Sequence, residues 1–360
     1  MKGVIKFLAV AVFIFTSFSV TAFAQESEDV LEEFSEAIPE GVDINVDDVT
    51  SELGVEAIFR EIAAALSDQT GDAVRFFLLL LGFAVVISLA SHSSFGTDGA
   101  LDSAVQIAVS TIATASIFAA LYDVCLGLKE SLVGVVDFFA SVIPIFTLIS
   151  TSSGAVSTAG AQAFNMNLTL ALIEKFCTGA LLPASFAVFS LGFTASISEG
   201  GAGNVAKGVK SAFMWGVGLV GSLLAAVIAM QSVVASASDN ATLRAARYAA
   251  SGMIPIVGST VASALSTLGG GMAYLKSTVG MGSVAVILVL SIAPLVSLLL
   301  YRLAISTCLI YLEFSGSAGG VRCYSAFRAA LDTLIAVYAS SVLVCIIEVV
   351  VFVKGGVSPT

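Results

Sequence analysis

Long apolar runs follow one another along most of this chain, and they limit it to a membrane protein. Hydrophobic residues make up 58% of its 360 positions and charged residues 11%, whereas a soluble domain carries roughly 25% charged residues. We expect the runs to be helices, because backbone groups inside lipid must be hydrogen-bonded within their own segment. The apolar stretches lie near residues 73–91, 103–127, 132–150, 167–198, 210–236, 252–268, 281–304 and 326–353.

The start of the chain has the pattern of a secretory signal peptide over residues 1–24. Lys2 and Lys6 form a positive region before an apolar run, and Ala22 and Ala24 fit a cleavage site before residue 25. An uncleaved anchor helix is the alternative, but the run is shorter than the roughly 20 residues that span a bilayer. We therefore expect the segment after it to be extracytoplasmic.

Two segments separate this leader from the membrane domain. Residues 25–50 are rich in acids and poor in large apolar side chains, which predicts a disordered lead-in. Residues 51–70 carry an apolar stripe that includes Ile58 and Ile62, which predicts an amphipathic helix. That helix lies on the membrane surface, on a partner or on the chain's own loops. The polytopic membrane domain then occupies residues 73–353.

A short phrase that occurs twice predicts an internal duplication of the membrane domain. The Ile-Pro-Ile sequence around Pro144 recurs around Pro255, 111 residues later, and a further proline follows each copy by 39 residues, at Pro183 and Pro294. Duplicated units are common in membrane transport proteins. We expect two units of three elements each and a closing helix, at about 103–198, 210–304 and 326–353.

The two Ile-Pro-Ile elements predict proline-broken or re-entrant segments. Proline removes a backbone donor, and small and polar residues such as Gly258 and Thr267 follow Pro255. Such a segment suits the lining of a cavity, although an ordinary kinked span is the alternative. Re-entry gives six crossings and parallel copies, whereas full crossing gives eight and inverted copies. The loop charges favour neither topology.

Charged and small residues inside the apolar runs are further candidate site residues. Glu174 and Lys175 interrupt one run, where they either line a pore or reach out to lipid head groups. Gly216, Gly218 and Gly221 fall on one expected helix. Small residues let helices approach closely, so these glycines predict tight packing within the fold or between subunits.

The sequence shows no set of residues typical of an enzyme. It contains no metal-ligand spacing, no phosphate-binding glycine loop and no nucleophile with a supporting base. We therefore expect a non-enzymatic protein without a metal or cofactor. A nucleic-acid partner is not expected either, because the chain has no basic face to neutralise phosphates.

Four short segments in the second half carry a more specific pattern. They are Lys210–Leu219, Leu243–Ala249, Met253–Gly258 and Leu275–Gly280. This pattern resembles the stage III sporulation protein AE family of endospore-forming bacteria, and the resemblance extends over most of residues 51–353. With it, the candidate structural or pore-lining residues are Pro144, Pro255, Gly258, Thr267, Lys276, Gly280, Glu174 and Lys175.

The resemblance implies a function that composition and spacing do not. Members of the family are membrane components of a channel between mother cell and forespore, in the mother-cell-derived outer membrane of the forespore. The implied partners are the other stage III A membrane proteins, a secretion-type ATPase and ring proteins between the membranes. A stand-alone secondary transporter for a small solute is the alternative. Whether the chain forms a pore or scaffolds one stays open.

Overall fold

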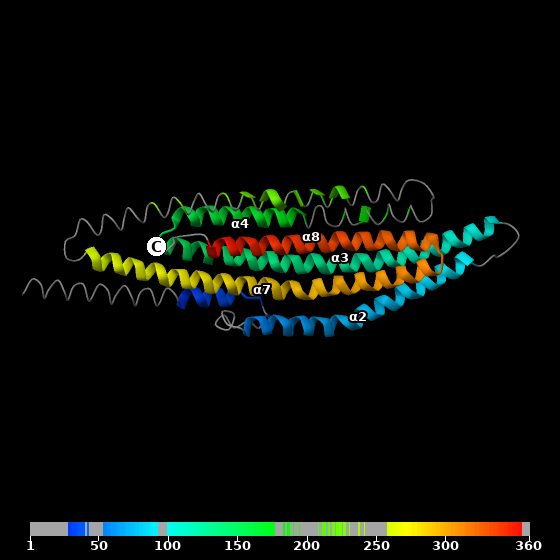
Figure 1. Ribbon diagram of the computed structural model, residues 1–360, viewed down its shortest axis with the longest axis horizontal. Coiled ribbons are helices and arrows are strands. Elements are labelled where there is room, and N and C mark those ends of the chain that lie inside the picture. The colour runs from blue at the N-terminus through cyan, green and yellow to red at the C-terminus, as the bar shows by residue number, and fades with distance from the viewer. Residues whose placement is uncertain are drawn as a thin grey trace, which may run out of the picture.

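The chain folds into long helices that lie side by side in one elongated bundle (Figure 1). The computed structural model describes residues 28–39, 42, 53–92, 99–176 and 258–354, with isolated positions between 183 and 241. The long helices of this part are α2 (Leu53–His92), α3 (Gly99–Ser152), α4 (Val156–Phe176), α7 (Gly258–Phe314) and α8 (Ala318–Lys354). The predicted all-helical class is confirmed for the residues described.

Four of these helices, α2, α3, α7 and α8, are long and apolar enough to cross a membrane. Their length and composition are those of a multi-pass membrane protein. The 54 residues of α3 span about 81 Å and the 57 residues of α7 about 86 Å. The hydrocarbon core of a bilayer is only about 30 Å thick. Both helices therefore continue well beyond it.

Single helices contain stretches that hydropathy divides. α2 contains most of the expected amphipathic helix and the stretch 73–91, and α3 contains both 103–127 and 132–150. Lys129 and Glu130 mark the expected boundary inside α3, but both residue types form helices well. These two charged residues separate two apolar stretches, but they do not end the helix.

The first Ile-Pro-Ile element is continuous helix and is not broken at Pro144. Proline at this position removes the donor that would bond the carbonyl of Ala140. The neighbouring side chains of Val142 and Ile145 are buried in the core, and Phe146 stacks on α8, so packing holds the helix together across the missing bond. The first copy is therefore not proline-broken, and the choice between a re-entrant segment and a full span stays a prediction.

The internal duplication and the number of crossings stay predictions. Pro255 lies outside the described residues, and the stretch 210–236 is described only at isolated positions. The stretch 281–304 is helical and belongs to α7, which begins at Gly258. The closing stretch 326–353 lies within α8.

Two helical hairpins, α3–α4 and α7–α8, share one turn geometry. Gly154 and Gly316 have φ values of 82° and 75°, which glycine adopts without the strain of a Cβ atom. The residue after each glycine donates its N–H to a carbonyl five positions back, from Ala155 to Ser150 at 2.9 Å and from Ser317 to Leu312 at 3.2 Å. This arrangement satisfies carbonyls at the helix end and reverses the chain.

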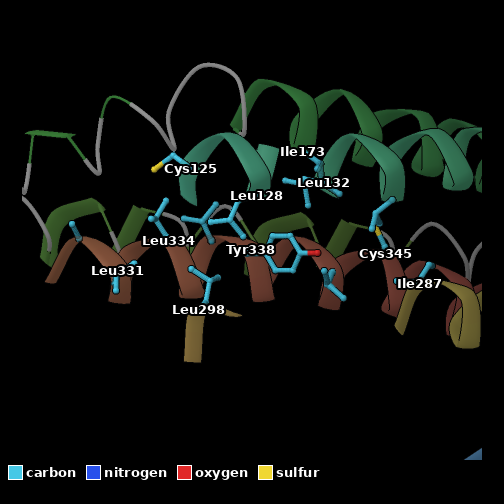
Figure 2. Packing of buried hydrophobic residues seen from close by; sticks show 14 of the residues in the cluster. Cys125, Leu128, Leu132, Ile173, Ile287, Leu298, Leu331, Leu334, Tyr338 and Cys345 are labelled. Carbon is cyan, nitrogen blue, oxygen red and sulfur yellow. The ribbon is translucent and has the colours of Figure 1, made fainter. Parts of the chain in front are cut away.

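The hydrophobic core lies mainly between α3, α7 and α8. Figure 2 shows Leu128 and Leu132 of α3 facing Leu334 and Tyr338 of α8, with Leu298 of α7 beside them. Each buried aliphatic side chain contributes roughly 1.5–3 kcal/mol to stability when it leaves water. In the part of the bundle that faces lipid, close packing supplies the stabilisation instead.

A short acidic helix over residues 28–37 packs on α7 (Figure 1). Val30 and Phe34 are buried, and a Cβ added at Gly282 of α7 would lie 2.9 Å from Cε1 of Phe34. The helix exposes the acids Glu28, Asp29, Glu32, Glu33 and Glu36. This part of the expected disordered lead-in is thus structured, because apolar residues four positions apart form a stripe even where composition is acidic.

Candidate functional site

A cavity of about 680 Å³ lies between α2, α3 and α7. Apolar side chains form most of its wall, and polar side chains from all three helices reach it. The described lining residues are Gln69, Phe76, Ala120, Asp123, Val124, Gly127, Leu128, Ser131, Gly134, Leu290, Ala293, Pro294, Ser297, Leu298 and Tyr301. Its volume lies in the range of pockets that hold small molecules.

Small residues on facing helices create this space. Gly127 and Gly134 are seven positions apart on α3, which places them on the same face two turns apart. A Cβ atom added at either glycine would meet no atom within 4 Å. Across from them, α7 presents Ala293 and Ser297. The cavity therefore exists because the facing positions of α3 and α7 carry small side chains or none.

Pro294 shapes the α7 wall of the cavity. Its ring nitrogen has no hydrogen, so the carbonyl of Leu290 loses its helical partner. Oγ of Ser131 on α3 donates to this carbonyl at 3.5 Å and lies 2.9 Å from Oη of Tyr338 on α8. Since Ser131 carries a single hydroxyl proton, Tyr338 is the donor to Ser131 in this arrangement. These two hydrogen bonds connect α3, α7 and α8 at the point where α7 lacks one backbone hydrogen bond.

The polar side chains of the cavity are not bonded to one another. In the described part of the chain, the Asp123 carboxylate, the Gln69 amide and the Tyr301 hydroxyl have no hydrogen-bond or ion-pair partner. The ring of Tyr301 lies 4.6 Å from that of Phe76, tilted by 55°. No basic side chain occurs among the described lining residues. The cavity thus combines a negative charge, free polar groups and two aromatic rings.

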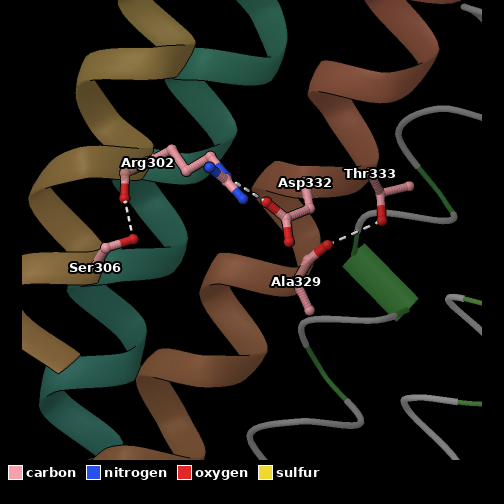
Figure 3. A network of polar contacts seen from close by, with 5 residues as sticks. All are labelled: Arg302, Ser306, Ala329, Asp332 and Thr333. Atoms are coloured by element: carbon pink, nitrogen blue, oxygen red, sulfur yellow. Dashed lines mark hydrogen bonds and ion pairs between the residues drawn. The ribbon is translucent and has the colours of Figure 1, made fainter. Parts of the chain in front are cut away.

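An ion pair between α7 and α8 lies next to this region. Nε of Arg302 is 2.7 Å from Oδ1 of Asp332, and their side chains are 42% and 26% exposed (Figure 3). Unpaired charges inside an apolar span cost on the order of 3 kcal/mol or more. The pair therefore neutralises two charges that interrupt the apolar runs of α7 and α8.

A second polar cluster lies around the end of α8, where this helix contacts α3, α4 and α7. Oγ1 of Thr169 on α4 donates to Oε1 of Glu348 on α8 at 2.8 Å, and Glu348 is buried. Nζ of Lys276 on α7 lies 4.7 Å from the ring centroid of Phe352. That ring stacks on Phe146 of α3 with centroids 3.8 Å apart. Four helices are joined by these contacts.

The structure brings two of the sequence-predicted site residues together. Lys276 and Gly280 are one turn apart on α7 and both contact the end of α8, at Phe352 and Val353. The contact is a packing site of the bundle and does not line the cavity.

The other predicted site residues lie elsewhere or outside the described part. Pro144 is exposed on α3, and Glu174 and Lys175 are exposed in the last turn of α4. Gly258 and Thr267 lie near the start of α7. Pro255 lies outside the described residues. A Cβ added at Gly216, Gly218 or Gly221 would meet no atom of a described residue within 4 Å.

Most of the cavity residues were not singled out from sequence. Asp123 was visible as a charge within an apolar run, and Pro294 as a repeated proline. The spacing of Gly127 and Gly134 is a further signal, because it puts two positions without a side chain on one face of the helix. The contributions of Gln69 and the aromatic pair depend on how the helices pack, which the sequence does not display.

Comparisons with known proteins give a family. The profile described as stage III sporulation protein AE matches residues 40–356. A protein of that name from Bacillus subtilis (strain 168) is 23% identical over 239 residues, in an alignment that covers 63% of this chain. The alignment spans 57% of that relative's length. No solved structure matches the chain. Because the profile covers most of the sequence, this chain belongs to the stage III sporulation protein AE family.

Proposed function

We propose that the chain is a non-enzymatic membrane subunit of a multiprotein channel or secretion complex that links mother cell and forespore during endospore formation. Its proposed place is the mother-cell-derived outer forespore membrane, with the N-terminal segment extracytoplasmic. The proposed partners are the other stage III A membrane proteins, a secretion-type ATPase and ring proteins between the membranes. Membership in the sporulation family supports the cellular process.

The cavity between α2, α3 and α7 is the observation that carries a transport role. A helix bundle that only scaffolds others gains stability when such a space is filled. Here small residues on two helices keep it open, and polar groups face into it. A subunit through which solutes pass, or which binds them on the way, requires such a space.

Long helices support contact with partners outside the bilayer. α3 and α7 are each more than twice as long as the hydrocarbon core is thick. Their extensions give the subunit a surface for proteins in the space between two membranes. The acidic helix over residues 28–37 adds a charged face to α7 on such an extension or at its border with the lipid.

Filling the cavity tests the proposal. Gly127→Leu and Gly134→Leu each add a side chain where the structure has free space, so we expect a stable protein and a loss of heat-resistant spores. Gly82→Leu on α2 is the matched control, because its surroundings are equally open and it does not line the cavity. Normal spore counts with both cavity variants, at wild-type protein levels on a blot, would remove the cavity from the mechanism.

A stand-alone secondary transporter is the second candidate, because the cavity lies within a single chain. The two functions differ in what the purified chain does alone. Solute uptake by vesicles that contain only this chain supports the transporter. Absence of uptake, together with cross-links from the chain to other sporulation membrane proteins in cells, supports the channel subunit.

A further inference from the structure

We propose that the cavity between α2, α3 and α7 is a binding site for a small organic cation, with Asp123 as its counter-charge. The proposal concerns binding by this chain and does not depend on the channel role, since a subunit can hold a ligand without conducting it. It rests on the charge, the free polar groups, the aromatic pair and the volume of one cavity.

The Asp123 carboxylate needs a cation or water. It lies inside an apolar span of α3, where an ionised group is costly unless it faces protein, water or a counter-charge. Arg75 of α2 and Arg302 of α7, on the helices that border the cavity, are paired with Asp72 and Asp332 and do not line it. Lys129 is six positions further along α3, about 240° around the helix, and so lies on another face.

Two neutral polar groups of the cavity complete a set of acceptors. Within the described residues, the Gln69 amide and the Tyr301 hydroxyl make no hydrogen bond, and both line the cavity with Asp123. Asp123 is exposed at the wall of the cavity, and Gln69 and Tyr301 are half-buried there, so all three groups need partners once lipid surrounds the bundle. A lipid chain in this space would leave all three groups unsatisfied, whereas an ammonium ligand would contact each of them favourably.

The aromatic pair favours a cation over an anion. Phe76 and Tyr301 both line the cavity with ring centroids 4.6 Å apart, and the face of an aromatic ring attracts an ammonium group. An anion would meet the Asp123 carboxylate. The described lining offers it no basic side chain. The site therefore selects for positive charge joined to an apolar body.

Binding by the purified full chain in phosphatidylcholine nanodiscs tests the site. The probe is benzyltrimethylammonium, titrated by calorimetry, and benzenesulfonate is the control of similar size and opposite charge. We expect saturable binding of the cation and none of the sulfonate. Equal binding of both probes, or no binding of the cation to a monodisperse wild-type protein, would overturn the proposal.

Variants identify where the probe binds. Asp123→Asn should weaken cation binding by about tenfold or more, whereas Asp137→Asn should leave it unchanged, because Asp137 lies on the same helix but does not line the cavity. Gly127→Leu should abolish binding by filling the space, which gives a second test if Asp123→Asn is unstable. Wild-type affinity in a folded Asp123→Asn or Gly127→Leu protein would refute the site. Spore counts report on the channel role separately, since the titration needs no other subunit.

Discussion

Gly280 of α7 lies directly against Val353 of α8, so closely that a Cβ atom at position 280 would collide with Cγ2 of the valine. The valine side chain is branched at Cβ and has little freedom to move away. Glycine at this position therefore sets the distance between the two helices near the end of the bundle.

Replacement of Gly280 by alanine should lower the stability of the purified protein. We expect Gly280→Ala to cost about 1–3 kcal/mol, the typical effect of overpacking a close contact. The matched control is Gly160→Ala on α4, where the added Cβ meets nothing and helix propensity should raise stability slightly. Unfolding midpoints in detergent measure both. A Gly280→Ala protein as stable as the wild type would show that α7 and α8 adjust freely.

The helix over residues 28–37 should depend on Phe34 for its contact with α7. Phe34→Ala removes a buried ring and should cost about 3–5 kcal/mol of local stability, which releases the helix. Limited proteolysis within residues 28–39 should then become faster. Glu33→Ala on the exposed face of the same helix is the control and should be cleaved like the wild type. Unchanged cleavage of the Phe34 variant would contradict the packing shown here.

The Arg302–Asp332 ion pair should show coupling between its two members. Arg302→Leu alone removes this ion pair but keeps the Asp332 charge, which should destabilise the protein by on the order of 1–3 kcal/mol, less than for a fully buried pair because the arginine is 42% exposed. The double variant Arg302→Leu/Asp332→Leu should recover part of this loss, because no charge remains. A double-mutant cycle of unfolding free energies measures the coupling, and additive losses would argue against a pair.

The buried Glu348 should need the hydroxyl of Thr169. Thr169→Val keeps the shape of the side chain but removes the donor 2.8 Å from Oε1, which should cost about 1–3 kcal/mol. Thr151→Val is the control, because the Thr151 hydroxyl is exposed and bonds only to carbonyls of its own helix. Equal unfolding midpoints for the two variants would show that the contact between α4 and α8 adds no stability.

Hydropathy was sufficient to predict the class of this fold but not the ends of its helices. Apolar runs predicted helices that the structure shows in α2, α3, α7 and α8. Hydropathy predicts separate stretches at 103–127 and 132–150, yet α3 continues through Lys129 and Glu130, which lie between them. Helix formation depends on backbone propensity, whereas hydropathy reports burial and lipid contact. Helix ends predicted from hydropathy alone are therefore wrong where a charged residue lies inside a long helix.

The site was harder to predict, because it depends on tertiary packing. Lys276 and Gly280 were singled out by their motif, and both are buried at α8, where they serve packing. The cavity combines Gln69 of α2, Asp123 of α3 and Tyr301 of α7, three residues with no common motif. Their convergence is set by how the helices cross, which periodicity in one chain does not encode.

Pro294 divides α7 into two arms of unequal length. The arm from Gly258 to Pro294 is about 54 Å long and meets the other arm at a point where one helical backbone bond is missing. A swing of about 5° there would carry its far tip through roughly 5 Å. Both arms line the adjoining cavity, the long one with Leu290 and Ala293 and the short one with Ser297 and Tyr301, so a ligand there would act on the angle between them and displace the distant tip of α7.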